Sequence, residues 1–180
     1  MSHPARRAWI GLGSNLGGQW GASADQQLLT AVPRISALPG TLLVAASSLY
    51  RSPPMGPADQ PDYANAVVRV VTRLTPLTLF RQLKQLERAA GRDPRGVRWG
   101  PRALDLDLLL VEGVTQNDAM LRLPHVGIAE RAFVLLPWAE LDPDLFLPGL
   151  ATVAECASRV ASGATQRWSA PPINPDMELP

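Results

Sequence analysis

The sequence predicts an α+β fold of the ferredoxin-like class, with a mixed, mainly antiparallel sheet and helices packed on it. The predicted elements run strand, helix, strand, strand, helix, strand, and further helices follow. The length of 180 residues, with 46% hydrophobic and 18% charged residues, suits one globular domain. We therefore expect a single domain over residues 1–180, with a core at about 8–148 and a C-terminal extension at about 149–180.

The first half of the chain predicts two strands, one helix and a long loop. Residues 8–12 are a short apolar run typical of a strand. Residues 25–32 have the apolar spacing of a helix, which Pro33 should end. Residues 41–50 are expected as one strand. Residues 52–63 contain four prolines and cannot form a central strand, so we expect a long loop of functional importance.

The next helix and the strand before it have clear sequence signals. Residues 65–74 are rich in β-branched side chains and predict a strand. Thr75 and Pro76 form a helix start, with threonine as the N-cap and proline at the first position. Leucines at positions 79, 83 and 86 form one apolar stripe, and Gly91 should end the helix.

The second half of the chain predicts one strand and two more helices. Residues 92–101 are a charged loop with glycine and proline, and residues 104–111 are an apolar strand. Residues 128–141 predict a helix that is interrupted or bent at Pro137. Residues 151–162 predict a peripheral helix.

Composition excludes several functional classes. The net charge is only +1, which argues against a nucleic-acid-binding protein. No apolar run approaches the roughly 18 residues of a membrane span, and the N-terminus has no signal-peptide pattern. The single cysteine, Cys156, excludes an internal disulfide. We expect a cytoplasmic monomer without nucleic-acid or membrane partners.

Asp105 and Asp107 interrupt the apolar strand at residues 104–111. Because side chains alternate along a strand, both carboxylates lie on one face. Residues two apart on a strand have Cβ atoms roughly 7 Å apart, so the two carboxylates can bind cations together. Oxygen ligands favour Mg²⁺ over Zn²⁺. The continuous apolar run that follows predicts a central, buried strand, whereas an exposed face with two solvated acids is the alternative.

A basic segment precedes this acidic pair. Seven positive residues stand between Arg81 and Arg102, against two acids. Arginine binds phosphate with paired hydrogen bonds, so arginine next to a cation site predicts phosphoryl transfer. A solvated basic surface is the alternative. GLGSNLGG near the N-terminus lacks the Lys-Ser/Thr ending of a P-loop.

Tyr63 and Asn65 are two apart at the start of a strand and share a face. An aromatic ring beside an amide suits a flat heterocycle, because the ring can stack while the amide forms hydrogen bonds. A core tyrosine with an asparagine turn cap is an equally good interpretation of these two residues alone.

Four separated motifs resemble one known family, in the family's order. They are IGLGSNLG, then SSLYRSPPMGP with QPDYANAVV, then RWGPRALDLDLL, and finally LPHVGIAERAFVLLPWAEL. The family is 6-hydroxymethyl-7,8-dihydropterin pyrophosphokinase of folate biosynthesis, and the resemblance covers about residues 9–148. It implies transfer of pyrophosphate from ATP to the 6-hydroxymethyl group of the pterin, with release of AMP and use of two Mg²⁺ ions.

The resemblance also implies roles for individual residues. The implied catalytic residues are Arg92, Arg102, Asp105 and Asp107, and the two aspartates would also bind the metal. The implied pterin-binding residues are Ser52, Pro53, Met55, Tyr63, Asn65, Trp99 and Phe133. The implied ATP-binding residues are Lys84, Glu87, Arg98, Leu108, Arg122, His125 and Arg131.

Two rival functions remain to be weighed. A catalytically weakened pterin- or nucleotide-binding protein of the same fold would have no need of two Mg²⁺ ligands, so the aspartate pair argues against it. An RNA-binding module is the other rival, because ferredoxin-like sheets often bind RNA. The sequence lacks the paired aromatic signature of such modules.

Overall fold

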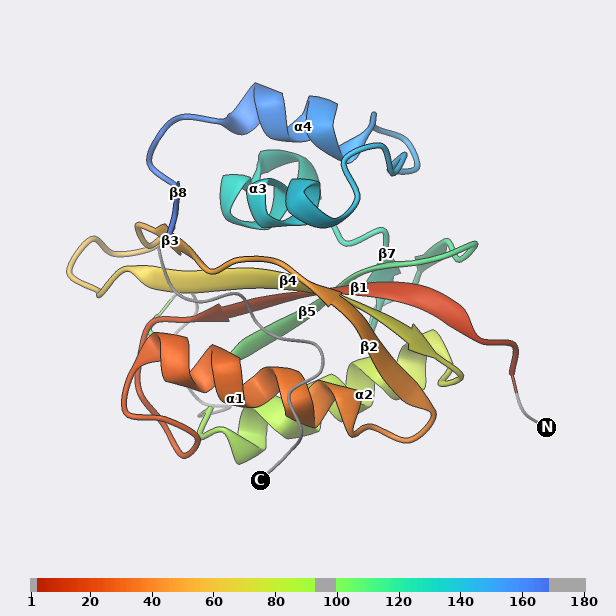
Figure 1. Cartoon of the computed structure of the whole chain (residues 1–180), viewed down its shortest axis with the longest axis horizontal. Coiled ribbons are helices and arrows are strands. Elements are labelled where there is room, and N and C mark those ends of the chain that lie inside the picture. The colour runs from red at the N-terminus through yellow and green to blue at the C-terminus, as the bar shows by residue number, and fades with distance from the viewer. Residues whose placement is uncertain (1–2, 93–99, 169–180) are drawn as a thin grey trace.

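One antiparallel sheet separates two layers of helices (Figure 1). The structure is a computed structural model that describes residues 3–92 and 100–168. The strands are β1 Arg6–Ser14, β2 Thr41–Ala46, β3 Tyr50–Ser52, β4 Tyr63–Thr72, β5 Asp105–Val111, β6 Gln116–Asn117, β7 Arg122–Leu123 and β8 Gln166–Arg167. The helices are α1 Ala24–Ser36, α2 Pro76–Ala89, the short 3-10 helix η1 Ile128–Glu130, α3 Ala132–Leu141 and α4 Val153–Val160.

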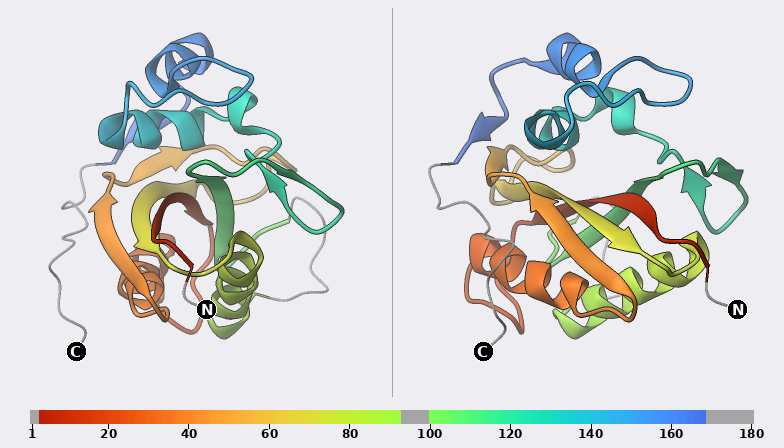
Figure 2. Two further views of the ribbon diagram at one scale, coloured as in Figure 1. Left: turned by 90° about the vertical axis from the view of Figure 1, so that its right-hand side faces the viewer. Right: turned by 45° about the vertical axis from the view of Figure 1, so that its right-hand side comes forward.

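The topology confirms the predicted ferredoxin-like α+β class. The main sheet has the order β5-β1-β4-β3-β8, and β2 pairs with the other part of β4. All pairings among these described strands are antiparallel. Helices α1 and α2 cover one face of the sheet, while α3 covers the other and carries α4 on its outer side (Figures 1 and 2).

The single strand expected at residues 41–50 is two strands. Ala46 pairs with Val68 and Tyr50 with Asn65, so one edge advances four residues while β4 advances three. Ser47 absorbs the extra residue, because its backbone N–H donates to Val67 O and its hydroxyl accepts from Val67 N, both at 2.9 Å. No pattern in the sequence indicates that the Ser47 hydroxyl takes the place of a backbone acceptor in the strand pairing.

Two expectations about proline were wrong. Helix α1 continues through Pro33 to Ser36. Val32, directly before this proline, and Ile35, two residues after it, are fully buried, and burying them outweighs the roughly 3 kcal/mol that an internal proline costs a helix. The predicted helix at 128–141 is broken at Arg131 rather than at Pro137, which lies inside α3.

The apolar residues form two clusters, one on each side of the sheet. The larger cluster lies between the sheet and helices α1 and α2, and includes Leu28, Leu83 and Leu106. The smaller one lies between the sheet and helices α3 and α4, where the rings of Trp9 and Trp138 are 6.1 Å apart. Trp9 Nε1 also donates to Asp142 Oδ2 at 2.7 Å, which fixes the end of α3 on the sheet.

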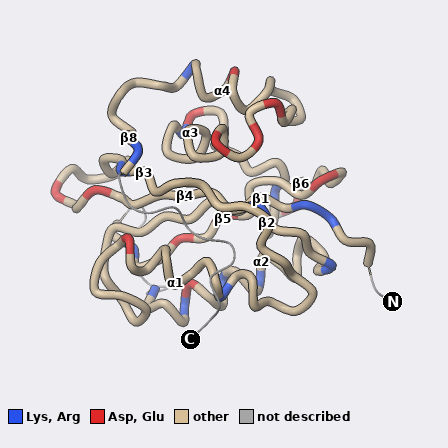
Figure 3. The backbone as a smooth tube through the Cα atoms, viewed as in Figure 1, with Lys and Arg blue, Asp and Glu red and all other residues tan. Residues whose placement is uncertain are grey.

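The described part of the C-terminal extension, up to Trp168, packs on the body of the protein. Helix α4 begins with a capping box formed by Thr152 and Glu155 and lies against α3. Strand β8 follows it and pairs with β3. None of the helices in the described residues is long and apolar enough to span a membrane. Positive and negative residues occur together on both sides of the sheet (Figure 3).

The buried leucines of α2 stabilise the packing of α1 and α2 on the sheet. Leu83 is fully buried against the sheet, so Leu83→Ala should lower the free energy of unfolding by about 2–5 kcal/mol. Gln85→Ala on the exposed side of the same helix should change it by less than about 0.5 kcal/mol. Urea unfolding followed by circular dichroism measures both, and equal effects would contradict the assigned helix face.

Candidate active site

A cavity of about 320 Å³ lies on the α3 side of the sheet. Its floor is formed by β1, β4 and β5, and α2, α3 and the segment after β3 supply its walls. The lining includes Ser52, Pro53, Met55, Tyr63, Asn65, Lys84, Arg92, Arg102, Asp105, Asp107, His125, Arg131 and Phe133. Thirteen residues expected at the site from the sequence are thus brought together from six separate segments.

Two glycines of β1 form the floor of the cavity. In the register of the sheet, Gly13 stands between Asn65 and Asp105, and Gly11 stands beside Asp107. Residues in register share a face, so the missing side chains leave space between the amide of β4 and the carboxylates of β5. Neither glycine is among the predicted site residues, although both belong to the IGLGSNLG motif. Their spacing of two within an apolar strand is the signal that could have found them.

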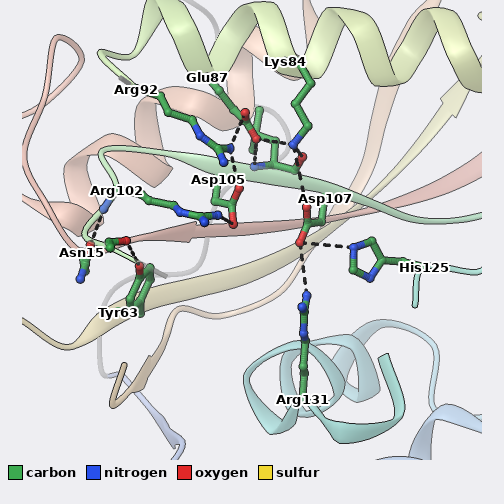
Figure 4. A network of polar contacts seen from close by, with 12 residues as sticks. Asn15, Tyr63, Lys84, Glu87, Arg92, Arg102, Asp105, Asp107, His125 and Arg131 are labelled. Carbon is green, nitrogen blue, oxygen red and sulfur yellow. Dashed lines mark hydrogen bonds and ion pairs between the residues drawn. The ribbon is translucent and has the colours of Figure 1, made fainter. Parts of the chain in front are cut away.

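Asp105 is held by two arginines from different segments (Figure 4). Arg92 Nη1 donates to Asp105 Oδ1 at 2.7 Å, and Arg102 Nη1 donates to Asp105 Oδ2 at 2.9 Å. Burial opposes the charge on Asp105, but Arg102, Lys84 and Arg92 outweigh it and hold the pKa of Asp105 below its ordinary value. Asp105 is therefore a carboxylate at neutral pH.

Asp107 is surrounded more loosely by three positively polarised groups. Its nearest cation is Arg131, with Nη1 at 3.4 Å from Oδ2. His125 Nε2 lies 3.8 Å from the same oxygen, and Lys84 Nζ lies 3.9 Å from Oδ1. Burial lowers the pKa of His125 despite the opposite effect of Asp107, so the histidine is neutral at pH 7. The Asp107 oxygens are thus exposed to the cavity without a short ion pair among the described residues.

Glu87 supports the cavity from beneath. Its side chain is only 3% exposed and accepts hydrogen bonds from Leu106 N at 2.7 Å and from Lys84 Nζ at 2.6 Å. Arg92 Nη1 lies 2.5 Å from its other oxygen. Burial raises the pKa of Glu87, and Lys84 partly offsets this. This carboxylate holds two cations beside the strand β5, Lys84 within α2 and Arg92 just after it. Glu87 does not itself line the cavity.

The opposite wall of the cavity carries the aromatic residues and an amide. Asn65 Nδ2 donates to Ser52 Oγ at 2.9 Å, to Tyr63 O at 3.3 Å and to Tyr50 O at 3.4 Å. Tyr63 OH donates to Gly100 O at 3.2 Å, and burial raises its pKa. Because the Asn65 amide nitrogen is fully used within the protein, its oxygen remains for a ligand.

Three expected site residues, Glu87, Leu108 and Arg122, do not line the cavity. Glu87 lies beneath it, as described above. Leu108 is 2% exposed and packs into the core between the sheet and α2, so its side chain points away from the carboxylates. Arg122 is exposed on β7 and is not among the lining residues. Arg98 and Trp99 lie outside the described residues.

The expectation that the aspartate strand is central was also wrong. Among the described strands, β5 is at the edge of the main sheet. It is nevertheless buried on both faces, because leucines pack toward α2 on one side and Leu109 packs with the α3 cluster on the other. His125 N also donates to Leu109 O at 2.8 Å and covers part of the free edge. The apolar run at residues 104–111 therefore reflects burial by helices on both faces, and not a central place in the sheet.

Two buried polar side chains that the sequence analysis missed hold the charged segment in place. Asn15 Oδ1 accepts from Arg102 N at 2.7 Å, and its Nδ2 donates to Pro61 O at 3.2 Å. Gln27 Nε2 donates to Ala90 O and Ala103 O, both at 3.2 Å. They connect the N-terminal part of the chain to both ends of the segment that carries the cavity arginines. Asparagine and glutamine in loops and helices give no such signal in a single sequence.

Gly18, the last residue of the GLGSNLGG motif, serves close packing. A Cβ atom at Gly18 would lie 2.2 Å from Gln27 Nε2 and 2.4 Å from Ala90 O. Only glycine allows this approach of backbone and amide. The motif therefore positions Gln27 and the end of α2, in agreement with the absence of a P-loop signature.

Comparison with known proteins gives one family. The family model described as 7,8-dihydro-6-hydroxymethylpterin-pyrophosphokinase (HPPK) matches residues 9–143. A 2-amino-4-hydroxy-6-hydroxymethyldihydropteridine pyrophosphokinase of Methylorubrum extorquens is 43% identical over 161 residues, covering 89% of this chain and 98% of the relative. A protein of the same name from Haemophilus influenzae is 42% identical over 154 residues, covering 86% of this chain and 92% of the relative.

Solved structures share the fold. A crystal structure of Plasmodium falciparum HPPK-DHPS matches with a TM-score of 0.65 at 13% identity, covering 89% of this chain and 46% of that one. A crystal structure of HPPK-DHPS in complex with substrates matches with a TM-score of 0.67 at 11% identity, covering 91% of this chain and 47% of that one. The chain therefore spans about half the length of these two structural relatives.

Replacing Gln27 should weaken the support of the charged segment. In Gln27→Leu, Ala90 O keeps a bond from Gln19 N and Ala103 O keeps one from Ser14 Oγ, but Trp20 N loses the Gln27 oxygen that accepts from it. We expect the free energy of unfolding to fall by about 1–3 kcal/mol. Its exposed neighbour Gln26 is the control, and Gln26→Leu should cost less than about 1 kcal/mol. Urea unfolding measures both variants, and an equal loss of unfolding free energy in the two would contradict the role assigned to Gln27.

Proposed function

The chain belongs to the 7,8-dihydro-6-hydroxymethylpterin-pyrophosphokinase family, and we propose how its cavity performs the reaction of that family. The protein transfers pyrophosphate from ATP to the 6-hydroxymethyl group of 6-hydroxymethyl-7,8-dihydropterin, in folate biosynthesis, and AMP is released. The family match over residues 9–143, together with 43% identity over 161 residues to a relative of that name, carries this conclusion. The comparisons give no support to the alternative of a catalytically weakened binding protein.

We propose that the pterin occupies the side of the cavity formed by β3, β4 and α3. Tyr63 and Phe133 supply aromatic faces for the flat ring, and both line the cavity. The Asn65 oxygen, left over by the three bonds of its amide nitrogen, accepts from an N–H group of the heterocycle. Ser52, Pro53 and Met55 close this side, with Ser52 fixing the direction of the Asn65 amide.

The phosphates of ATP are proposed to occupy the charged side. Four cationic side chains, Lys84, Arg92, Arg102 and Arg131, line the cavity there, against the carboxylates of Asp105 and Asp107. Arg92 and Arg102 share the carboxylate of Asp105, and a phosphate group is a further anionic partner for their remaining N–H groups. His125, being neutral, can donate one hydrogen bond to a phosphate oxygen.

The acidic pair fits Mg²⁺ as a proposed cofactor. In the described residues, no group of three or more His, Cys, Asp or Glu side chains could hold a metal ion. Protein-bound Mg²⁺ usually takes one or two carboxylates and completes its octahedral shell with water and substrate phosphates. Asp105 and Asp107 would provide those carboxylates. Bound Mg²⁺ would neutralise charge on the phosphates during transfer.

The contribution of the protein to the reaction is positioning and charge balance. The hydroxyl oxygen of the pterin attacks the β-phosphorus of ATP and gives up its proton to solvent, while the bond between that phosphorus and the AMP oxygen breaks. The aromatic wall orients the alcohol, while the arginines hold the transferred group in line with it. Glu87 is a positioning residue, because it holds Arg92 and Lys84 and lies outside the cavity.

We also propose that the whole chain is one pyrophosphokinase domain that acts as a cytoplasmic monomer. The packing of α4 and β8 on the body of the fold supports the first part. Analytical ultracentrifugation of the full chain tests the second, and a dimer at assay concentration would contradict it.

The metal assignment predicts that Asp107 is indispensable for turnover. Asp107→Asn removes a proposed ligand and should reduce AMP release by about 100-fold or more, because the charge on the phosphates is no longer balanced. Asp144→Asn, an exposed acid of the α3–α4 segment, should have no effect. A coupled AMP assay across a range of Mg²⁺ concentrations measures both. Near-normal turnover in a folded Asp107→Asn protein would contradict the assignment.

The pterin assignment predicts that Phe133 contributes to affinity. Phe133→Ala should weaken pterin binding by about 1–3 kcal/mol, the effect of one lost stacking contact. Fluorescence titration with the pterin measures this change. Phe146→Ala is the matched control, since Phe146 is 62% exposed and does not line the cavity. If both variants bind the pterin as the unchanged protein does, Phe133 belongs to the core alone.

A further inference from the structure

Strand β8 lies against the short strand that leads into the pterin side of the cavity (Figures 1 and 2). It pairs antiparallel with β3, with Arg167 opposite Tyr50 and Gln166 opposite Arg51. Trp168 N continues this pairing by donating to Leu49 O at 2.7 Å. The family model matches residues 9–143, so this C-terminal segment lies beyond the matched part of the chain.

The Arg167 guanidinium connects β8 to two other segments. Its Nε and Nη2 donate to Ser48 Oγ at 2.9 and 2.6 Å. Nε also lies 3.2 Å from Glu140 Oε1 on α3. The arginine is thus the cationic partner of Glu140 at the junction of β3, α3 and β8.

Glu140 holds the start of β3 from the other side. It accepts from Ser48 N at 2.7 Å and from Tyr50 OH at 2.8 Å. Burial and the bond to Glu140 raise the pKa of Tyr50 to about 12, so the phenol keeps its proton and the bond at physiological pH. Residues 48–50 are therefore fixed between a carboxylate of α3 and a guanidinium of β8.

The Trp168 side chain adds an apolar contact to this arrangement. It is half-buried against the core on the α1 side of the sheet, and the Arg51 guanidinium lies 4.5 Å from its ring centroid. Both ends of the β3–β8 pair are thus held by side chains as well as by the strand hydrogen bonds.

The position of β3 determines how the Asn65 amide is oriented in the wall proposed for the pterin. The strand has only three residues, and it ends at Ser52, whose hydroxyl accepts from the Asn65 amide. Tyr50 O accepts from the same amide, so β3 contributes two of the three acceptors that orient Asn65. Without β8, one edge of β3 would lack its strand partner, and a strand this short has few other bonds to keep it in register.

We propose that residues 166–168, held by Arg167, are a positioning element for pterin binding. They fix β3, and through Ser52 and the Asn65 amide they set the affinity of the cavity for the pterin without touching it. This proposal rests on the proposed pterin site. It predicts a selective effect, because the nucleotide side of the cavity is built from α2, β5 and the end of the arginine segment.

Substitution of Arg167 tests the proposal on the full chain. In Arg167→Ala, the dissociation constant for the pterin should rise about tenfold, the effect of losing charge-assisted hydrogen bonds that hold the binding wall. The dissociation constant for a non-hydrolysable ATP analogue with Mg²⁺ should change by less than about twofold. Arg167→Lys keeps the ion pair with Glu140 but loses the paired bonds to Ser48, and should restore part of the affinity.

The matched control is a second arginine of the same C-terminal part of the chain. Arg159→Ala removes an exposed positive charge on α4 and should leave both dissociation constants unchanged.

The outcomes distinguish this proposal from the proposed function. If the unchanged protein does not bind the pterin, the proposed site itself is wrong. If it binds and a folded Arg167→Ala protein binds equally well, the positioning role is overturned while the site stands. Equal weakening of pterin and nucleotide binding would also overturn it, because that result indicates a general loss of structure.

Discussion

Charge neutralisation around the acidic pair of β5 constrains the arrangement of this protein. Two carboxylates two residues apart on a partly buried strand face repel each other unless cations lie close to both. Here the cations come from separate places in the chain: Arg92 and Arg102 reach Asp105, while Arg131 and Lys84 lie near Asp107. Helix α2, the edge strand and the start of α3 are thereby held around one cavity.

The buried carboxylate of Glu87 extends this constraint into the core. A charged group with 3% of its side chain exposed is costly unless it is paired and hydrogen-bonded. Glu87 meets both conditions through Lys84, Arg92 and the backbone of Leu106. The pairing leaves Arg92 ready to bind a polyanion, since its guanidinium is already oriented before any phosphate is present.

The side of the cavity proposed for the pterin depends on hydrogen bonds of a different kind. Neutral acceptors from β3 and β4 orient the Asn65 amide, and the position of β3 depends in turn on elements distant in sequence, namely Glu140 and Arg167. The two sides of the cavity are therefore supported separately, the charged side by α2 and the neutral side by α3 and β8. This separation is what allows one side to be perturbed without the other.

Local patterns in the sequence determined much of the fold. The N-cap threonine and Pro76 fixed the start of α2, and the alternation of Asp105 and Asp107 with leucines placed both carboxylates on one face. The motifs that resemble the family also indicated thirteen side chains that line the cavity. These features are short-range, because each depends on residue type and on the period of the helix or strand.

Tertiary structure decided what depends on contacts between distant residues. The passage of α1 through Pro33 depends on burial of Ile35, and the division of residues 41–50 depends on the bond between the Ser47 hydroxyl and Val67. The edge position of β5 was hidden because helices bury it as completely as neighbouring strands would. Gly11, Gly13, Asn15 and Gln27 gained their roles only through partners elsewhere in the chain. A single sequence records the capacity of an amide to donate or of a glycine to leave space, but only the folded chain supplies the group that uses it.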